Sequence, residues 1–164
     1  MRPDRHDIER TIFGGIIATL IVTALMFAAT KLDLPNIDMA SALGTAFVAK
    51  GAAFPAYPLT GAWWLGLALF FVVGAVLSPL VFAYAFGGLL GSPWLRGVEW
   101  AVFLWIIGGV GVMTAMGLGF NDAHGNHPIS SVLASLAAHL IYGVVLGQVA
   151  GTAFRQPSSV HKAA

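Results

Sequence analysis

The amino-acid sequence predicts an all-α protein, a transmembrane four-helix bundle with a short interfacial helix between its first and second helices. Only 9% of the 164 residues are charged and 58% are hydrophobic, whereas about a quarter of the residues of a soluble domain are charged. Four segments also reach the roughly 20 apolar residues needed to cross a hydrocarbon core. Backbone groups in lipid must bond within their own segment, so these segments are predicted to be helices.

The four predicted spans cover about residues 8–30, 63–86, 96–119 and 128–154 of a single integral membrane domain, 1–164. The first span could be mistaken for a signal peptide. Its uncharged run from Thr11 to Thr30 nevertheless exceeds the roughly 7–15 residues of a signal peptide's apolar region. The sequence therefore predicts a permanent span.

The long connection between the first two spans is predicted to contain a helix within about residues 38–50. Apolar and small residues recur there at helical spacing: Ala40, Leu43, Gly44, Phe47 and Val48. Asn36 or Asp38 can cap this helix. Because it is too short to span, we expect it to lie on the outer membrane face or to fold back over the bundle.

The distribution of Lys and Arg predicts the orientation in the membrane. Four spans put both termini on one side, and six cations fall on that side: Arg2, Arg5, Arg10, Arg96, Arg155 and Lys162. The other side holds Lys31 and Lys50. The positive-inside rule then places both termini in the cytoplasm. Trp63, Trp64, Trp94 and Trp100 resemble interfacial aromatic residues.

Each predicted span carries a stripe of small and hydroxyl residues that we expect to face protein. In the fourth span Ser131, Ser135, His139, Tyr142 and Gly143 share one face. Thr19 and Thr23 of the first span, Ser78 of the second and Thr114 of the third are the hydroxyl residues predicted to complete a polar pocket around His139 and Tyr142. Gly143, Gly147 and Gly151 form a close-packing run whose partner helix can belong to this chain or to another.

His139 lies about 16 Å along a helix that begins at Pro128, close to the middle of the membrane. Desolvation disfavours its charged form, so we expect a neutral side chain bonded to a hydroxyl of a neighbouring helix. The alternatives are a proton-relay residue or a ligand to haem or to a metal ion. A haem would need a second axial ligand, for which Met113 and Met116 are the candidates within the chain.

Two further groups of polar residues each have two possible interpretations. Asp122, His124 and His127 are weak candidates for a metal site, and the competing interpretation is a polar turn before the fourth helix. Arg96 and Glu99 are spaced for an interfacial ion pair, and the competing interpretation for Glu99 is a proton pathway.

The sequence offers no catalytic residues that we would assign. There are no cysteines, and phosphate-binding, zinc-protease and serine-hydrolase motifs are missing. We therefore expect a protein that is not an enzyme, with no cofactor favoured and no attraction to nucleic acid from its net charge of +1.

The segments "TALMF…LDLPNIDMASALGT" and "AHLIYGVVLG" resemble an uncharacterised family of small bacterial four-span membrane proteins, a domain of unknown function. The matching positions are Thr23 to Met26, Leu34, Pro35, Asp38, Leu43, Gly44, His139, Leu140, Tyr142, Gly143, Leu146 and Gly147. Asp33 stands where the family pattern has glycine. The resemblance implies that His139 and Tyr142 belong together with the loop that holds Asp38.

The expected role is that of a small accessory or scaffold subunit of a larger, perhaps respiratory, inner-membrane complex. The partners are then the lipid bilayer and other membrane subunits, or a second copy that packs through glycine-rich faces. A carrier or channel for a small molecule or proton is the alternative, and a haem- or copper-binding membrane protein is the second alternative.

Overall fold

The computed structural model describes residues 3–34, 38–48, 61–115, 117, 119–121, 123 and 128–154, with the backbone alone for 45–48, 61 and 62. All regular elements within these ranges are helices. Four helical stretches are long and apolar enough to cross a membrane: Arg5–Lys31, Trp63–Gly88, Pro93–Met113 and Pro128–Ala153. The predicted all-α four-helix arrangement is therefore confirmed.

The first span is α1, Arg5–Lys31, and it begins with a capping box. The Asp4 carboxylate accepts a hydrogen bond of 2.8 Å from the backbone N–H of Asp7, and the Asp7 carboxylate accepts one of 3.0 Å from the N–H of Asp4. This reciprocal pair satisfies two amides at the helix start that have no intrahelical acceptor. It places the helix start three residues before the predicted boundary at 8.

The second span is one continuous helix with a change of hydrogen-bond pattern in its middle. It consists of α3 (Gly61–Phe71), the π-helical segment η1 (Val72–Leu77) and α4 (Ser78–Ala85). A 3₁₀ turn, η2 (Phe86–Gly88), follows it. Pro79 lies just after the π-helical segment and has no N–H to donate, so the hydrogen-bond ladder is interrupted there.

The third span ends earlier than the sequence predicts. It consists of α5 (Pro93–Ile107) and a second π-helical segment, η3 (Gly108–Met113), whereas the prediction was 96–119. Gly117, Gly119 and Asn121 have positive φ angles of 81°, 72° and 47°. A right-handed helix cannot continue through such residues, and glycine adopts the conformation at little cost.

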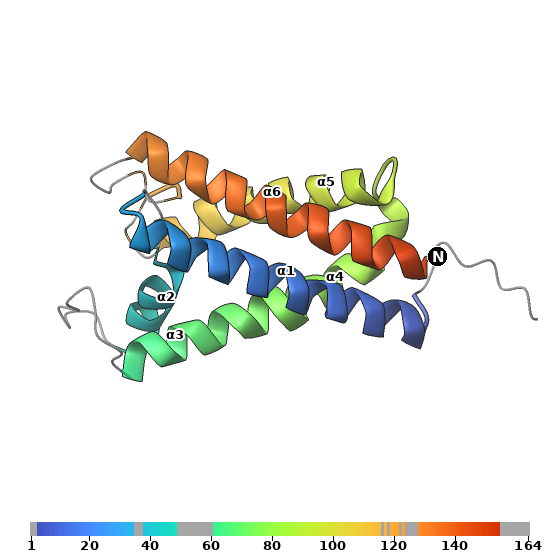
Figure 1. Ribbon diagram of the computed structural model, residues 1–164, viewed down its shortest axis with the longest axis horizontal. Coiled ribbons are helices and arrows are strands. Elements are labelled where there is room, and N and C mark those ends of the chain that lie inside the picture. Colours follow the sequence, from blue (N-terminus) through green and yellow to red (C-terminus); the bar gives the residue numbers. More distant parts are fainter. Residues whose placement is uncertain are drawn as a thin grey trace, which may run out of the picture.

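The fourth span is α6, Pro128–Ala153, and it packs along both α1 and α5. The second span packs on the other side of α1, so α1 lies between it and α6 (Figure 1). The beginning of α1, the end of α6 and the turn between α4 and α5 lie at one end of the bundle, which we call the terminal end (Figure 1). The short helix described next, α2, lies at the opposite end, which we call the α2 end.

The predicted short helix is α2, Met39–Val48, and its N-cap is Asp38. The Asp38 carboxylate accepts from the backbone N–H of Ser41 at 3.0 Å and from the Ser41 hydroxyl at 2.6 Å. The helix folds back against α3. The two backbones lie so close that a Cβ on Gly66 would meet the Ala40 carbonyl and the Gly44 amide. Of the two placements expected from the sequence, the structure adopts the one over the bundle.

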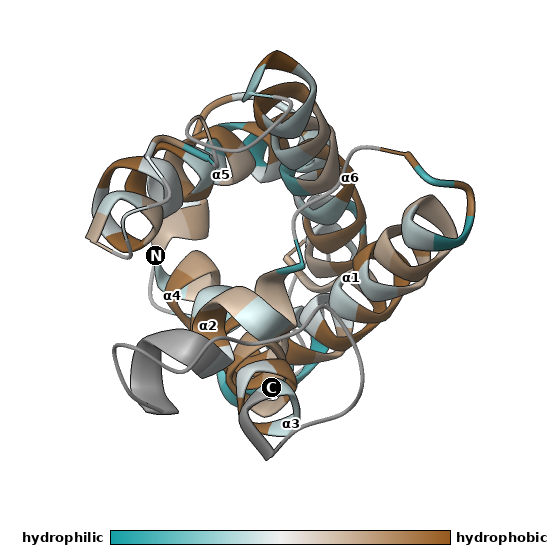
Figure 2. Cartoon of the chain, turned by 90° about the vertical axis from the view of Figure 1, so that its left-hand side faces the viewer, coloured by the Kyte–Doolittle hydropathy of each residue, from teal (hydrophilic) through white to brown (hydrophobic). Residues whose placement is uncertain are grey.

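The largest buried side chains gather toward the terminal end of the bundle. Phe82, Trp100 and Leu146 have at most 6% of their surface exposed and belong to one cluster with Ala18 and Ala150. Seen from the α2 end, the helices surround a common axis and are mostly hydrophobic along their length (Figure 2). Only 22–28% of the most apolar window of each span is buried, so most of the apolar surface faces outward.

Candidate functional site

The Tyr142 hydroxyl of α6 makes two hydrogen bonds to the second span. It donates to the Gly74 carbonyl of the second span at 2.6 Å and shares a hydrogen bond of 3.0 Å with the Ser78 hydroxyl. The Trp100 indole N–H of α5 donates to the same Ser78 oxygen at 3.0 Å. One contiguous set of hydrogen bonds therefore joins the second, third and fourth spans.

The Gly74 carbonyl needs an outside donor because of the local helix geometry. In an α-helix it would accept from the N–H of Ser78, but that group bonds to the carbonyl of Val73 in the π-helical segment. A π-helical bond would have to come from residue 79, which is proline. The Tyr142 hydroxyl satisfies this carbonyl, which would be costly to leave unpaired in an apolar environment.

A second polar contact holds the turn after the third span. The Ser135 hydroxyl of α6 donates to the Asn121 side-chain oxygen at 3.0 Å, and the Asn121 amide donates to the Trp105 carbonyl at 3.4 Å. Asn121 is 2% exposed. The turn is thus fixed to α6 and to the third span by one buried amide.

The hydrogen-bond partner of His139 is not the hydroxyl of a neighbouring helix that the sequence predicts. Its Nδ1 lies 2.8 Å from the Ser135 carbonyl of its own helix. Thr23 and Thr114 also donate within their own helices, to the carbonyls of Thr19 and Gly109. In lipid, a carbonyl one turn away is the nearest acceptor for a hydroxyl group, and it competes well with partners on other helices.

The predicted polar pocket is therefore divided. Ser78 and Tyr142 bind each other, Ser135 binds Asn121, and Thr19 is buried against Gly74 with its hydroxyl close to the backbone. Thr114 is exposed, as are Phe103 and Val110 on the same side of the third span. The buried face of the third span is instead the one that carries Gly97, Trp100, Ala101, Gly109 and Met113.

The glycine run of α6 packs inside this chain. A Cβ on Gly143 would meet the carbonyl of Gly97, and a Cβ on Gly147 or Gly151 would meet Pro93. The backbones of α5 and α6 touch along this line. The structure therefore identifies α5 as the partner that the sequence left open.

Arg96 and Glu99 do not form the expected ion pair. The Arg96 guanidinium donates to the carbonyls of Phe86 and Gly91 at 3.0 and 3.1 Å and lies 4.6 Å from the centre of the Phe86 ring. The Glu99 carboxylate accepts from the Leu90 N–H at 2.9 Å. Both side chains satisfy backbone groups of the turn between α4 and α5, which lack helical partners.

The weak metal candidates Asp122, His124 and His127 lie outside the described residues, as does Met116. Among the described residues no group of three or more His, Cys, Asp or Glu side chains is placed to hold a metal ion. Met113 is buried, at 3% exposure.

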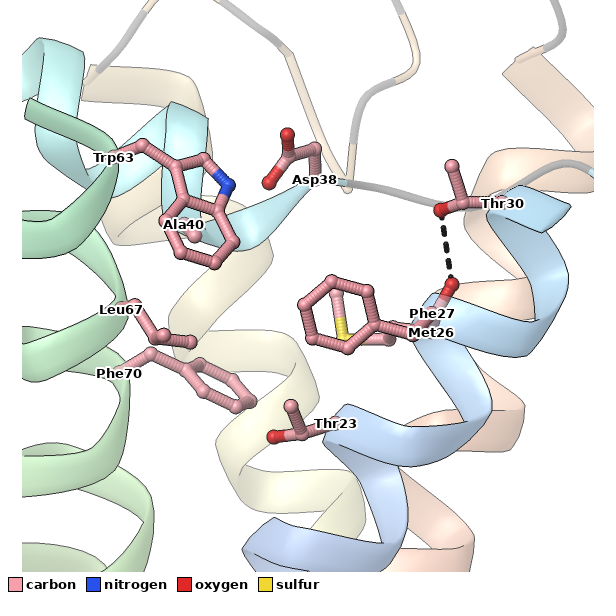
Figure 3. Close-up of a pocket in the computed structure, with 9 residues that line it drawn as sticks. All are labelled: Thr23, Met26, Phe27, Thr30, Asp38, Ala40, Trp63, Leu67 and Phe70. Carbon is pink, nitrogen blue, oxygen red and sulfur yellow. Dashed lines mark hydrogen bonds between the residues drawn. The ribbon is translucent and has the colours of Figure 1, made fainter. Parts of the chain in front are cut away.

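A pocket of about 40 Å³ lies between α1 and α3 at the α2 end (Figure 3). Its apolar wall comes from Met26 and Phe27 of α1 and from Trp63, Leu67 and Phe70 of α3. The rings of Phe27 and Trp63 are 6.2 Å apart and inclined at 59°. Two inclined aromatic rings from different helices therefore form one corner of the pocket.

The polar groups at this pocket are Asp38, Thr23, Thr30 and the Trp63 indole N–H. The indole nitrogen is buried and has no hydrogen-bond partner. Asp38 and Trp63 both point into the pocket (Figure 3). His139 and Tyr142 do not line it, so the grouping with Asp38 that the family resemblance implies is not made in this structure.

Three important residues were missed by the sequence analysis. Trp100 resembles an interfacial tryptophan but is 6% exposed, and its position one turn after Gly97 on the small-residue face is the signal that could have revealed this. Pro79 inside an apolar run is a known cause of helix distortion and was the available sign of the π-helical segment. Asn121 is one of several turn-forming residues in its loop, and nothing local distinguishes it.

The fold and the interior contacts define a multi-pass helical membrane protein whose buried polar side chains join one span to another. Residues 5–161 match DUF6789, a family of unknown function, and the chain belongs to that family. No curated protein and no solved structure matches the chain. The expected membership of an uncharacterised family is thus confirmed.

Proposed function

We propose that this protein is a non-enzymatic accessory or scaffold subunit of a larger complex in the bacterial inner membrane. Its interior polar groups support a structural role. The hydroxyls of Tyr142 and Ser78 and the indole of Trp100 are engaged with one another and with a backbone carbonyl. Such groups stabilise the bundle and are not free for proton transfer or substrate binding.

The observation that carries the proposal is an unused small-residue face on the third span. Gly108 and Gly111 have nothing within 4 Å of where a Cβ would lie. In contrast, Gly14, Gly15, Gly66, Gly74, Gly97, Gly109 and the glycine run of α6 are all in close contact within the chain. The third span is also the least buried, at 22%. Small exposed residues let another helix approach closely, as in membrane complexes.

The test is affinity purification of the tagged protein from its native host in mild detergent. We expect a larger membrane complex to co-purify with the wild type and to be lost with Gly111→Leu. Ala137→Leu is the matched control, because Ala137 is an exposed small residue of α6. Co-purification of a differently tagged second copy would identify self-association. Retention of the partner by Gly111→Leu, or no partner with the wild type, would contradict the proposal.

Two competing functions have direct assays on the same preparation. A carrier or channel that uses His139 and Tyr142 predicts a flux in reconstituted vesicles that His139→Leu abolishes. A haem- or copper-binding protein predicts a Soret band or bound copper after purification. Either result would replace the scaffold proposal.

A further inference from the structure

We propose that the pocket between α1 and α3 binds the ammonium group of an amphiphile. Three features of the pocket support this inference: an aromatic corner, an acidic side chain that pairs with none of the described cations, and a buried donor with no partner. The inference is independent of whether the protein is an accessory subunit.

The aromatic corner suits a cation that carries carbon. Phe27 and Trp63 present rings 6.2 Å apart and inclined at 59°, and Phe70 lies on the same wall. Aromatic faces attract ammonium groups, and this attraction is the usual basis for recognising alkylated ammonium ligands. The pocket has a volume of about 40 Å³, which is enough for a small cationic group.

The acidic side chain of Asp38 gives the mouth of the pocket a negative charge. The Asp38 carboxylate accepts two hydrogen bonds from Ser41. In the parts of the chain that the structure describes, the ion pair found is Arg5–Glu9, so no described cation faces Asp38. A carboxylate at the mouth of an aromatic pocket favours a cationic ligand over a neutral or anionic one of the same size.

The unpartnered donor indicates what else the ligand can carry. The Trp63 indole N–H is buried without an acceptor, and a buried donor of this kind is costly unless water or a ligand satisfies it. Trp63 begins the second candidate span, and tryptophans at the ends of membrane spans commonly lie at the level of the lipid headgroups. An ammonium group beside an acceptor oxygen is the arrangement of a zwitterionic phospholipid headgroup, and a free alkylammonium ion would supply the cation alone.

The binding test uses the purified full chain in a neutral detergent, titrated with octyltrimethylammonium, octanol and octanoate. We expect the ammonium compound to raise the melting temperature and the other two to have no effect beyond that on an unrelated membrane protein. Asp38→Asn should weaken ammonium binding by about fivefold, in keeping with a partly exposed charge pair beside aromatic rings. Asparagine caps helices as well as aspartate does, so α2 should persist. Asp33→Asn, an exposed acidic control in the same connection, should bind like the wild type.

The source of the ammonium group is tested by mass spectrometry of lipids retained after extraction from an equimolar phosphatidylethanolamine and phosphatidylglycerol bilayer. A lipid ligand predicts retention of phosphatidylethanolamine by the wild type, and less by Asp38→Asn and by Trp63→Phe. A free amine predicts octyltrimethylammonium binding without lipid retention, unaffected by Trp63→Phe. Trp64→Phe, at an exposed neighbour, is the control. Equal effects of octanol and octyltrimethylammonium, or unchanged ammonium binding and lipid retention in Asp38→Asn, would overturn the inference.

Discussion

At the scale of single residues, the Tyr142 hydroxyl takes part in two of the hydrogen bonds that join the spans. It supplies a donor to a carbonyl that its own helix cannot satisfy, and it borders the oxygen that accepts from Trp100. Hydrogen bonds between membrane helices average about 0.6 kcal/mol and reach about 1.7 kcal/mol. The contribution of the Tyr142 hydroxyl to stability should fall at the upper end of this range, because its loss leaves a backbone carbonyl unpaired.

Tyr142→Phe should lower the free energy of unfolding by about 1–2 kcal/mol, because the Gly74 carbonyl then stays buried without a donor. The measurement is denaturation of the purified protein in mixed micelles. Tyr84→Phe is the matched control, because Tyr84 is 60% exposed. Equal stability of the two variants would show that the hydroxyl contributes nothing to the fold.

His139→Leu should cost less than about 1 kcal/mol, because the contact that is lost lies within one helix. Ser135→Ala should cost more, since it removes the donor to the buried Asn121 oxygen. Both variants are compared with the wild type in the same unfolding assay. A larger loss for His139→Leu would indicate a contact of the imidazole across helices.

At the scale of elements, α6 supplies a hydrogen-bond donor that the π-helical segment of the second span lacks. Pro79 removes a donor from the second span, and Tyr142 of α6 supplies one. The ring of Pro79 also packs where α1 comes closest, since a Cβ on Gly15 would overlap it. One proline thus determines the contacts of the second span with two neighbouring helices.

Pro79→Ala restores a backbone N–H that can bond to the carbonyls one turn earlier. In the Pro79→Ala background, Tyr142→Phe should therefore cost about half or less of its cost in the wild type, which is a coupling of neighbouring sites. The four proteins of this double-mutant cycle are compared by unfolding in mixed micelles. Additive costs would mean that Tyr142 is not compensating for the proline.

Gly143→Ala tests the contact between α5 and α6. Its methyl group would meet the Gly97 carbonyl and the Ala101 side chain, and overpacking of this kind costs about 1–3 kcal/mol. Gly108→Ala adds the same methyl group where nothing lies within 4 Å, so its melting temperature should not fall. A stable Gly143→Ala protein would show that the two helices can separate without penalty.

At the scale of the whole molecule, aromatic rings and a long-range hydrogen bond join the helices at the terminal end. Phe82 meets Phe86 edge to face with ring centres 5.5 Å apart, and Phe86 stacks on Phe154 with ring centres 4.2 Å apart. Arg10 adds a hydrogen bond of 3.0 Å from α1 to Thr152 of α6. At the α2 end, the short helix α2 fills the space beside α3 and borders the ammonium pocket.

The orientation of this bundle is a prediction from charge. Both termini should be cytoplasmic, since six of the eight Lys and Arg residues lie on that side of the predicted topology. A reporter fused after Ala164 should be active if it needs the cytoplasm and inactive if it needs export. A fusion within residues 51–57, in the connection on the other side, is the control and should behave in the opposite way. The reverse pattern would place the pocket on the cytoplasmic side.

The four apolar helices, the short helix after Asp38 and the small-residue face of α6 could all be predicted before any contact was known. These properties depend on composition and spacing along one segment, which hydropathy and helical periodicity record directly. The family resemblance in the loop and the last helix also depends on local sequence alone. The match over residues 5–161 agrees with it.

The rotation of each helix about its axis, and the choice of which polar groups meet, became clear from the three-dimensional packing. Lipid and protein interior are similarly apolar, so hydropathy does not show which face of a membrane helix packs inward. The third span illustrates this, because its exposed face carries Phe103 and Val110 while Trp100 and Met113 are buried. The partner of Tyr142, the pairing of α5 with α6 and the pocket at Trp63 likewise arise from contacts between segments far apart in the chain.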